Sequence, residues 1–120
     1  MLNRNALQTA TLIGTVLQVA MVVAGHFVPY IALHVFAFGG MGISLIAGLL
    51  YGRASSGVAD GALGGVIAGG VCALIGIAVS VALHDTPAMI LVVGTLSSAV
   101  TGAIGGLIGR LIGGARTASA

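Results

Sequence analysis

Histidine and aspartate are the residues of this chain whose side chains could bind a ligand or move a proton. His26 and His84 each open an H-x-x-P sequence, Asp85 follows His84, and His34 lies within an apolar stretch. Imidazole groups ligate haem and metal ions, and they titrate near neutral pH. The alternative for His26 and His84 is helix capping, because a histidine in the last turn interacts favourably with the helix dipole. The alternative for His34 is a hydrogen bond to a neighbouring helix.

A second group of candidate residues is polar but uncharged. Gln18 lies deep in one apolar run, and Ser97, Ser98 and Thr101 lie in another. Such side chains either line a path for a solute or hydrogen-bond to another helix. Both aspartates stand at the ends of apolar runs, whereas proton-coupled pumps and exchangers use a buried carboxylate. The sequence therefore argues against that class and leaves open a channel or a facilitator for neutral solutes.

Sequence motifs of enzymes are absent. The chain has no HExxH sequence and no phosphate-binding loop, and its glycine-rich pieces do not follow a strand. The single cysteine, Cys72, cannot form an internal disulfide or a cysteine-based zinc site. The formal net charge of +2 is too small to indicate a nucleic-acid partner. We expect no enzymatic activity, no nucleic-acid partner and no required cofactor, with haem or metal binding through the histidines as the alternative.

The composition places these residues in a membrane protein. Hydrophobic residues make up 58% of the 120 residues and charged residues only 5%, whereas soluble domains are about one quarter charged. Four apolar runs are each long enough to cross a hydrocarbon core of about 30 Å; they cover residues 6–25, 31–51, 61–83 and 88–112. A signal peptide is the alternative for the first run. We predict an all-α integral membrane protein with one domain, residues 1–120, of four helices in two tandem antiparallel hairpins.

The arginines predict the orientation of this domain. With four crossings, Arg4, Arg53, Arg110 and Arg116 all fall on one side, and the two short turns on the other side have no lysine or arginine. Positive residues favour the cytoplasmic side. We therefore expect a bacterial inner-membrane protein with both termini in the cytoplasm. Arg53 and Arg110 would anchor their helices at that surface of the lipid bilayer.

Small residues recur at every fourth position of three runs, which places them on one face of each helix. Such faces let membrane helices approach closely, and the rows resemble the glycine-zipper packing pattern. The predicted packing residues are Gly40, Ser44, Gly48, Gly65, Gly69, Thr101, Gly105, Gly109 and Gly113. The rows exceed what a lone bundle needs, so we expect contact with copies of the chain or with other membrane subunits.

The two halves of the chain resemble each other. His26-x-x-Pro29 recurs as His84-x-x-Pro87, and Gly52-Arg53 recurs as Gly109-Arg110 at nearly the same distance along the chain. We interpret this as two copies of one hairpin with the same orientation in the membrane. The alternative is a chance alignment of apolar helices.

Three functions remain, in order of preference. The first is a structural or accessory subunit of a homo-oligomer or a larger membrane complex, acting by helix packing. The second is a small oligomeric channel or transporter for an ion or small solute, whose path is lined by Gln18, His34, Ser97, Ser98 and Thr101. The third is a membrane protein in which histidines ligate haem or a metal.

Overall fold

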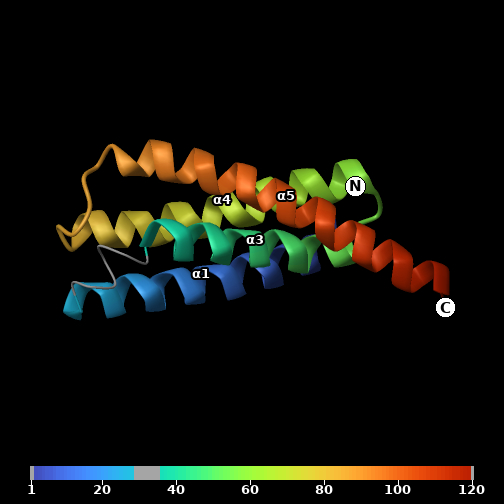
Figure 1. Ribbon diagram of the computed structural model, residues 1–120, viewed down its shortest axis with the longest axis horizontal. Helices are drawn as coiled ribbons and strands as arrows, with labels where there is room; N and C mark the ends of the chain where they lie inside the picture. The colour runs from blue at the N-terminus through green and yellow to red at the C-terminus, as the bar shows by residue number, and fades with distance from the viewer. Residues whose placement is uncertain (1, 29–35, 120) are drawn as a thin grey trace.

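A computed structural model describes residues 2–28 and 36–119, with side chains described for 2–28 and 38–113. All regular structure in these ranges is α-helical, which confirms the predicted class. The helices are α1 (Arg4–Phe27), α3 (Phe36–Ala54), α4 (Val58–Ala82) and α5 (Ile90–Ser119). They lie along the long axis of a molecule that measures 47 × 21 × 20 Å (Figure 1).

Among the described residues, three helices are long and apolar enough to cross a membrane: α1, α4 and the part of α5 from Ile90 to Gly113. The prediction of a helical membrane protein is therefore confirmed to this extent. The described part of α3 has 19 residues. The first residues of the predicted span 31–51, together with His34 and Pro29, lie outside the described ranges.

Two ends of the bundle are distinct. Phe27, Ala82 and Ile90 lie at one end, which we call the His26 end, and Arg4, Ala54 and Val58 lie at the other, which we call the Arg53 end. The chain begins at the Arg53 end, and α5 extends beyond the other helices there (Figure 1). All four arginines belong to segments at this end.

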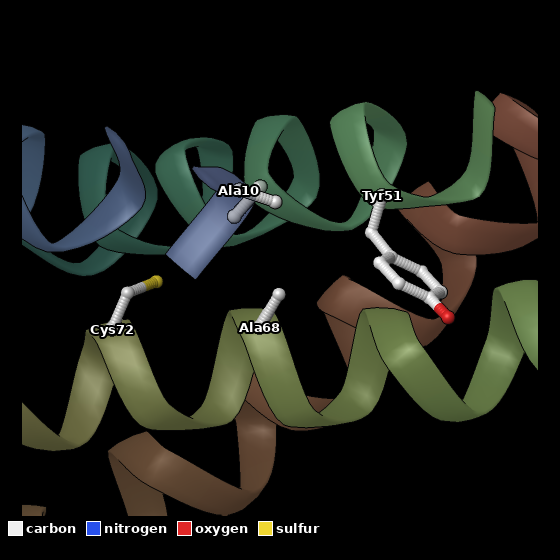
Figure 2. Close-up of a cluster of buried hydrophobic side chains, with 5 residues drawn as sticks. Ala10, Tyr51, Ala68 and Cys72 are labelled. Atoms are coloured by element: carbon white, nitrogen blue, oxygen red, sulfur yellow. The ribbon is translucent and has the colours of Figure 1, made fainter. Parts of the chain in front are cut away.

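Large apolar side chains point out of the bundle, and small ones fill it. Leu12, Phe38, Leu96 and Leu111 are among the exposed hydrophobic residues, with Phe38 81% exposed. The buried cluster instead contains Tyr51 and four small residues (Figure 2), namely Ala10, Ala47, Ala68 and Cys72. A hydrocarbon surround imposes no cost on exposed leucine and rewards close backbone packing. This distribution is that of a helix bundle in lipid.

Helices α3 and α4 occupy the centre of the bundle. Helix α1 packs on both of them from one side, and α5 packs on both from the other. Within the described ranges, no Cα atom of α1 lies within 8 Å of a Cα atom of α5. Space between these two outer helices is therefore available where α3 and α4 do not fill it.

Asp60 lies at the start of α4 but does not cap it. Gly57 is the N-cap, and α4 begins at Val58. Asp60 lies in the first turn, where a carboxylate is favoured by the helix dipole. Its Oδ2 accepts hydrogen bonds from the Ser56 backbone N–H (2.8 Å) and the Ser56 hydroxyl (3.0 Å). The carboxylate thus holds the loop that precedes the helix.

The end of α4 is closed by a left-handed residue. Leu83 is the C-cap, and His84 follows with a φ of 62°. The His84 N–H donates to the Val81 carbonyl (3.0 Å), and the Asp85 N–H donates to the Ser80 carbonyl (3.0 Å). These two bonds form a Schellman motif, in which glycine usually occupies the left-handed position. His84 therefore terminates α4 through its backbone.

Candidate functional site

The glycine rows meet one another inside the bundle. On α3, Gly48 lies against the backbone of Gly102 and Gly52 lies against that of Gly106. On α5, Gly105 and Gly109 lie against the backbone carbonyls of Leu45 and Leu49. A side-chain carbon at any of these glycines would overlap main-chain atoms. Helices α3 and α5 are thus in backbone contact along the half of the bundle nearest the Arg53 end.

Helix α4 makes the same kind of contact with α5. Gly65 lies against Gly102 and Gly106, and a Cβ at Gly69 would lie 2.8 Å from Gly102 Cα and 2.9 Å from the Ser98 carbonyl oxygen. Gly113 lies against the backbone of Arg53. Together these contacts leave no room for a path along the α3–α4–α5 interface near the Arg53 end.

Two of the predicted packing residues act through their side chains. Ser44 is fully buried, and its hydroxyl donates to the Gly69 carbonyl (3.2 Å). The Thr101 hydroxyl donates to the Ser97 carbonyl of its own helix (2.9 Å). Thr101 therefore forms its hydrogen bond within α5. It is not among the described residues that line the cavity near the His26 end.

A cavity of about 390 Å³ lies in the half of the bundle nearest the His26 end. All four described helices contribute to its wall, and the α4–α5 connection contributes Thr86. The polar lining residues are Gln18, Ser80, Thr86, Ser97 and Ser98, and the larger apolar ones are Met21, Val22, Met41, Ile77, Ile90 and Val93. The cavity brings together three of the residues predicted to line a path, since Gln18 comes from α1 and Ser97 and Ser98 come from α5. His34 lies outside the described ranges.

Gln18 is the most constrained polar group of the cavity. The residue is only 3% exposed, and its Nε2 donates to the Gly40 carbonyl (3.0 Å) and lies 3.4 Å from the Ser44 hydroxyl. The carbonyl partner fixes the orientation of the amide, because Nε2 is the donor and Oε1 the acceptor. Within the described ranges, Oε1 accepts no hydrogen bond. Gly76 makes room for this side chain, since a Cβ there would lie 2.8 Å from Gln18 Cβ.

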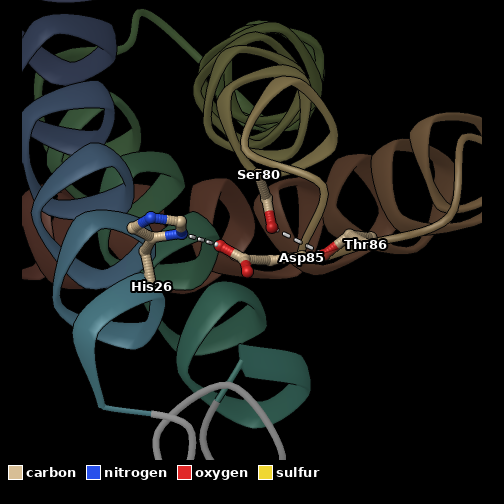
Figure 3. A network of polar contacts seen from close by, with 4 residues as sticks. All are labelled: His26, Ser80, Asp85 and Thr86. Carbon is tan, nitrogen blue, oxygen red and sulfur yellow. Dashed lines mark hydrogen bonds and ion pairs between the residues drawn. The ribbon is translucent and has the colours of Figure 1, made fainter.

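Two polar contacts border the cavity at the His26 end (Figure 3). His26 Nδ1 lies 2.8 Å from Asp85 Oδ2, which joins α1 to the α4–α5 connection. The hydroxyls of Ser80 and Thr86 are 2.6 Å apart. Among the residues with described side chains, no three histidine, cysteine, aspartate or glutamate residues are grouped as metal ligands. His26 and His84 have different positions, since His26 pairs with Asp85 and His84 ends α4.

A polar cluster at the Arg53 end was not anticipated from the sequence. Tyr51 is fully buried, its hydroxyl donates to Asp60 Oδ1 (2.7 Å), and it accepts a hydrogen bond from the Asn3 N–H (2.9 Å). Gly64 leaves space for the tyrosine ring. The cluster joins the chain start to α3 and α4. The sequence feature that could have indicated this cluster is a tyrosine at the end of one apolar run and an aspartate at the start of the next.

The two predicted anchor residues differ in their surroundings. Arg110 Nη1 donates to the Ser55 carbonyl of the α3–α4 loop (3.2 Å). Arg53 is exposed. Both stand at the Arg53 end, and Arg110 additionally holds α5 to the loop.

Comparison of the chain with protein-family models, curated proteins and solved structures gives no match.

Proposed function

We propose that all four helices cross the bilayer as two tandem hairpins, with the Arg53 end in the cytoplasm and the His26 end outside. The location of the arginines at one end supports this orientation. The cavity would then occupy the outward half of the protein, with the closely packed glycines on the cytoplasmic side of it.

The glycine contacts support an origin by duplication. The offset that carries Gly52-Arg53 onto Gly109-Arg110 also carries Gly48 onto Gly105, and Leu45 onto Gly102. The contact of Gly48 with Gly102 therefore has its counterpart in the contact of Gly105 with Leu45. Two equivalent helices packed around a local twofold axis along the membrane normal would make such exchanged contacts. The α3–α5 pair thus fits two hairpins of the same orientation.

The function that the geometry supports best is the binding of a small neutral solute within the membrane, as a carrier does. The observation that carries this proposal is the cavity of about 390 Å³ into which Gln18, Ser97 and Ser98 converge. Pockets for small molecules have this size, a mostly apolar lining and a few placed polar groups. No charged residue is among the described residues that line it, so a neutral solute suits it better than an ion.

The accessory-subunit hypothesis loses its main support. Its premise was that the rows of small residues exceed what one bundle needs. Gly48, Gly52, Gly65, Gly105 and Gly109 all contact backbone within the same chain. Their presence is explained without a second protein, and the cavity supports a ligand instead.

Co-purification tests the proposal. Wild-type protein and a Ser97→Leu variant, in which a larger side chain fills the cavity, would be purified in mild detergent. Val100→Leu is the matched control, because Val100 is 63% exposed on the same helix. Native mass spectrometry and extraction should detect a small molecule in the wild type and in Val100→Leu but not in Ser97→Leu. Equal small-molecule content in all three, together with a stoichiometric second protein, would reject the carrier in favour of the accessory subunit.

A further inference from the structure

We infer that the cavity selects a neutral ligand that donates a hydrogen bond, through an O–H or N–H group, to Gln18 Oε1. This inference rests on the proposed binding function and names its ligand class. It starts from an acceptor that the described chain leaves without a donor: Gln18 is 3% exposed and lines the cavity, and its contacts with Gly40 and Ser44 use Nε2. A ligand that supplies a donor therefore gains a hydrogen bond at Oε1 that a ligand without a donor cannot make.

The direction of Oε1 is fixed by its surroundings. Turning the amide would place Oε1 against the Gly40 carbonyl oxygen and would lose the bond of 3.0 Å that Nε2 makes. Such a contact between two acceptors is unfavourable. A ligand that only accepts hydrogen bonds, such as an ether or a ketone, therefore finds no matching group at Gln18.

The rest of the wall determines the body of the ligand. Met21, Met41, Ile77 and Val93 line the cavity, so the ligand must be largely apolar. Methionine side chains adapt to irregular shapes and contact aromatic rings favourably. The ionisable side chains of His26 and Asp85 are not among the described residues that line the cavity, and they contact each other at 2.8 Å, so no described counter-charge faces an ionic ligand. Small phenols and other neutral aromatic alcohols or amines have this chemistry.

Two isomeric probes test the inference directly. 4-Ethylphenol and 4-methylanisole have the same molecular formula, but only the phenol has an O–H donor. Binding to wild-type protein in mild detergent would be measured by ligand-observed NMR, with Ser97→Leu in the same micelles as the reference for partition into detergent. We expect the phenol to bind roughly fivefold more tightly than the ether, as one additional hydrogen bond would give.

The variants separate the role of the acceptor from that of the cavity. Gln18→Leu should abolish the preference for the phenol while retaining binding of the ether, and Gln8→Leu, an exposed glutamine of the same helix, should bind like wild type. Equal affinity of wild-type protein for the two isomers would overturn the inference but leave the proposed function intact. If neither isomer binds wild type better than Ser97→Leu, the inference and the proposed binding function are both rejected. The wild-type comparison needs no variant, so it stands even if Gln18→Leu does not fold.

Discussion

His26 Nδ1 lies 2.8 Å from Asp85 Oδ2, and this contact fastens the end of α1 to the connection between α4 and α5. In the sequence repeat, His26 is equivalent to His84. In the structure, His26 contacts Asp85, the residue after His84. Asp85 is adjacent to Thr86, which lines the cavity. The contact therefore holds the connection at the rim of the cavity.

We predict that this pair contributes little to global stability. The two side chains are 36% and 22% exposed, and exposed ion pairs contribute about 0–1 kcal/mol. His26→Ala, Asp85→Asn and the double variant should form a cycle with a coupling energy of about 0.5 kcal/mol, measured by unfolding in mild detergent. Strictly additive effects would show that the contact contributes nothing, and a coupling well above 1 kcal/mol would show a stronger bond than the geometry indicates.

Substitution of Gly48 should test the backbone contact between α3 and α5. A Cβ at Gly48 would overlap the Gly102 backbone, whereas a Cβ at Gly42 would meet nothing within 4 Å. We expect Gly48→Ala to destabilise the protein by about 1–3 kcal/mol, the usual cost of overpacking. Gly42→Ala, on the same helix, is the matched control and should be neutral or more stable, since alanine favours helix by roughly 1 kcal/mol. Similar unfolding curves for both variants would contradict the contact.

His84→Gly should stabilise the protein. His84 has a φ of 62°, and the left-handed region costs a residue with a side chain roughly 1 kcal/mol relative to glycine. We expect a gain of this order in the free energy of unfolding for His84→Gly and a loss for His84→Val, whose branched side chain tolerates the region least. Loss of stability in His84→Gly would show instead that the imidazole makes a contact of its own.

The same His84→Gly variant also tests whether the imidazole takes part in ligand binding, when the co-purified small molecule is measured. If His84 acts only through its backbone, His84→Gly should retain the small molecule that co-purifies with the wild type. The small-molecule content of Asp85→Ala would be compared with that of His84→Gly, because the Asp85 side chain contacts His26 of α1.

Composition and periodicity were sufficient to predict the helical membrane class, because apolar runs of about 20 residues and small residues at every fourth position are visible in the sequence itself. They could not show what the small faces contact. From the sequence, Gly48 and Gly105 could equally face a partner chain or another helix of the same chain. Their observed contacts with Gly102 and Leu45 show that they lie between α3 and α5. The partner chain stays a prediction, but the packing of α3, α4 and α5 uses Gly48, Gly65 and Gly105 within one chain.

The candidate site was predicted in its residue types but not in its arrangement. Gln18, Ser97 and Ser98 were recognised because polar groups in apolar runs are costly. Thr101 belongs to the same run, but its hydroxyl bonds to Ser97 of its own helix. The contributions of Met21 and Met41 could not be predicted, because apolar residues that line a cavity have the same pattern as residues that face lipid.

The buried tyrosine at the Arg53 end supports a final prediction. The Tyr51 hydroxyl bonds to Asp60 (2.7 Å) and to the Asn3 N–H (2.9 Å), so Tyr51→Phe leaves both partners without this contact. We expect a loss of about 0.5–1.5 kcal/mol in the free energy of unfolding, the usual net contribution of a hydrogen bond, because Asn3 is exposed and Asp60 half-buried, so water can reach both partners. Ser56→Ala is the control: it removes an exposed hydroxyl from the same carboxylate and should cost less than about 0.5 kcal/mol. The cluster joins the chain start to α3 and α4, so Tyr51→Phe should also increase hydrogen exchange of the first turn of α1. Asn3 is the N-cap of α1, and its Oδ1 accepts a hydrogen bond from the Ala6 N–H (3.1 Å). If exchange is unchanged, the tyrosine does not hold the chain start, and this cap alone holds the first turn of α1.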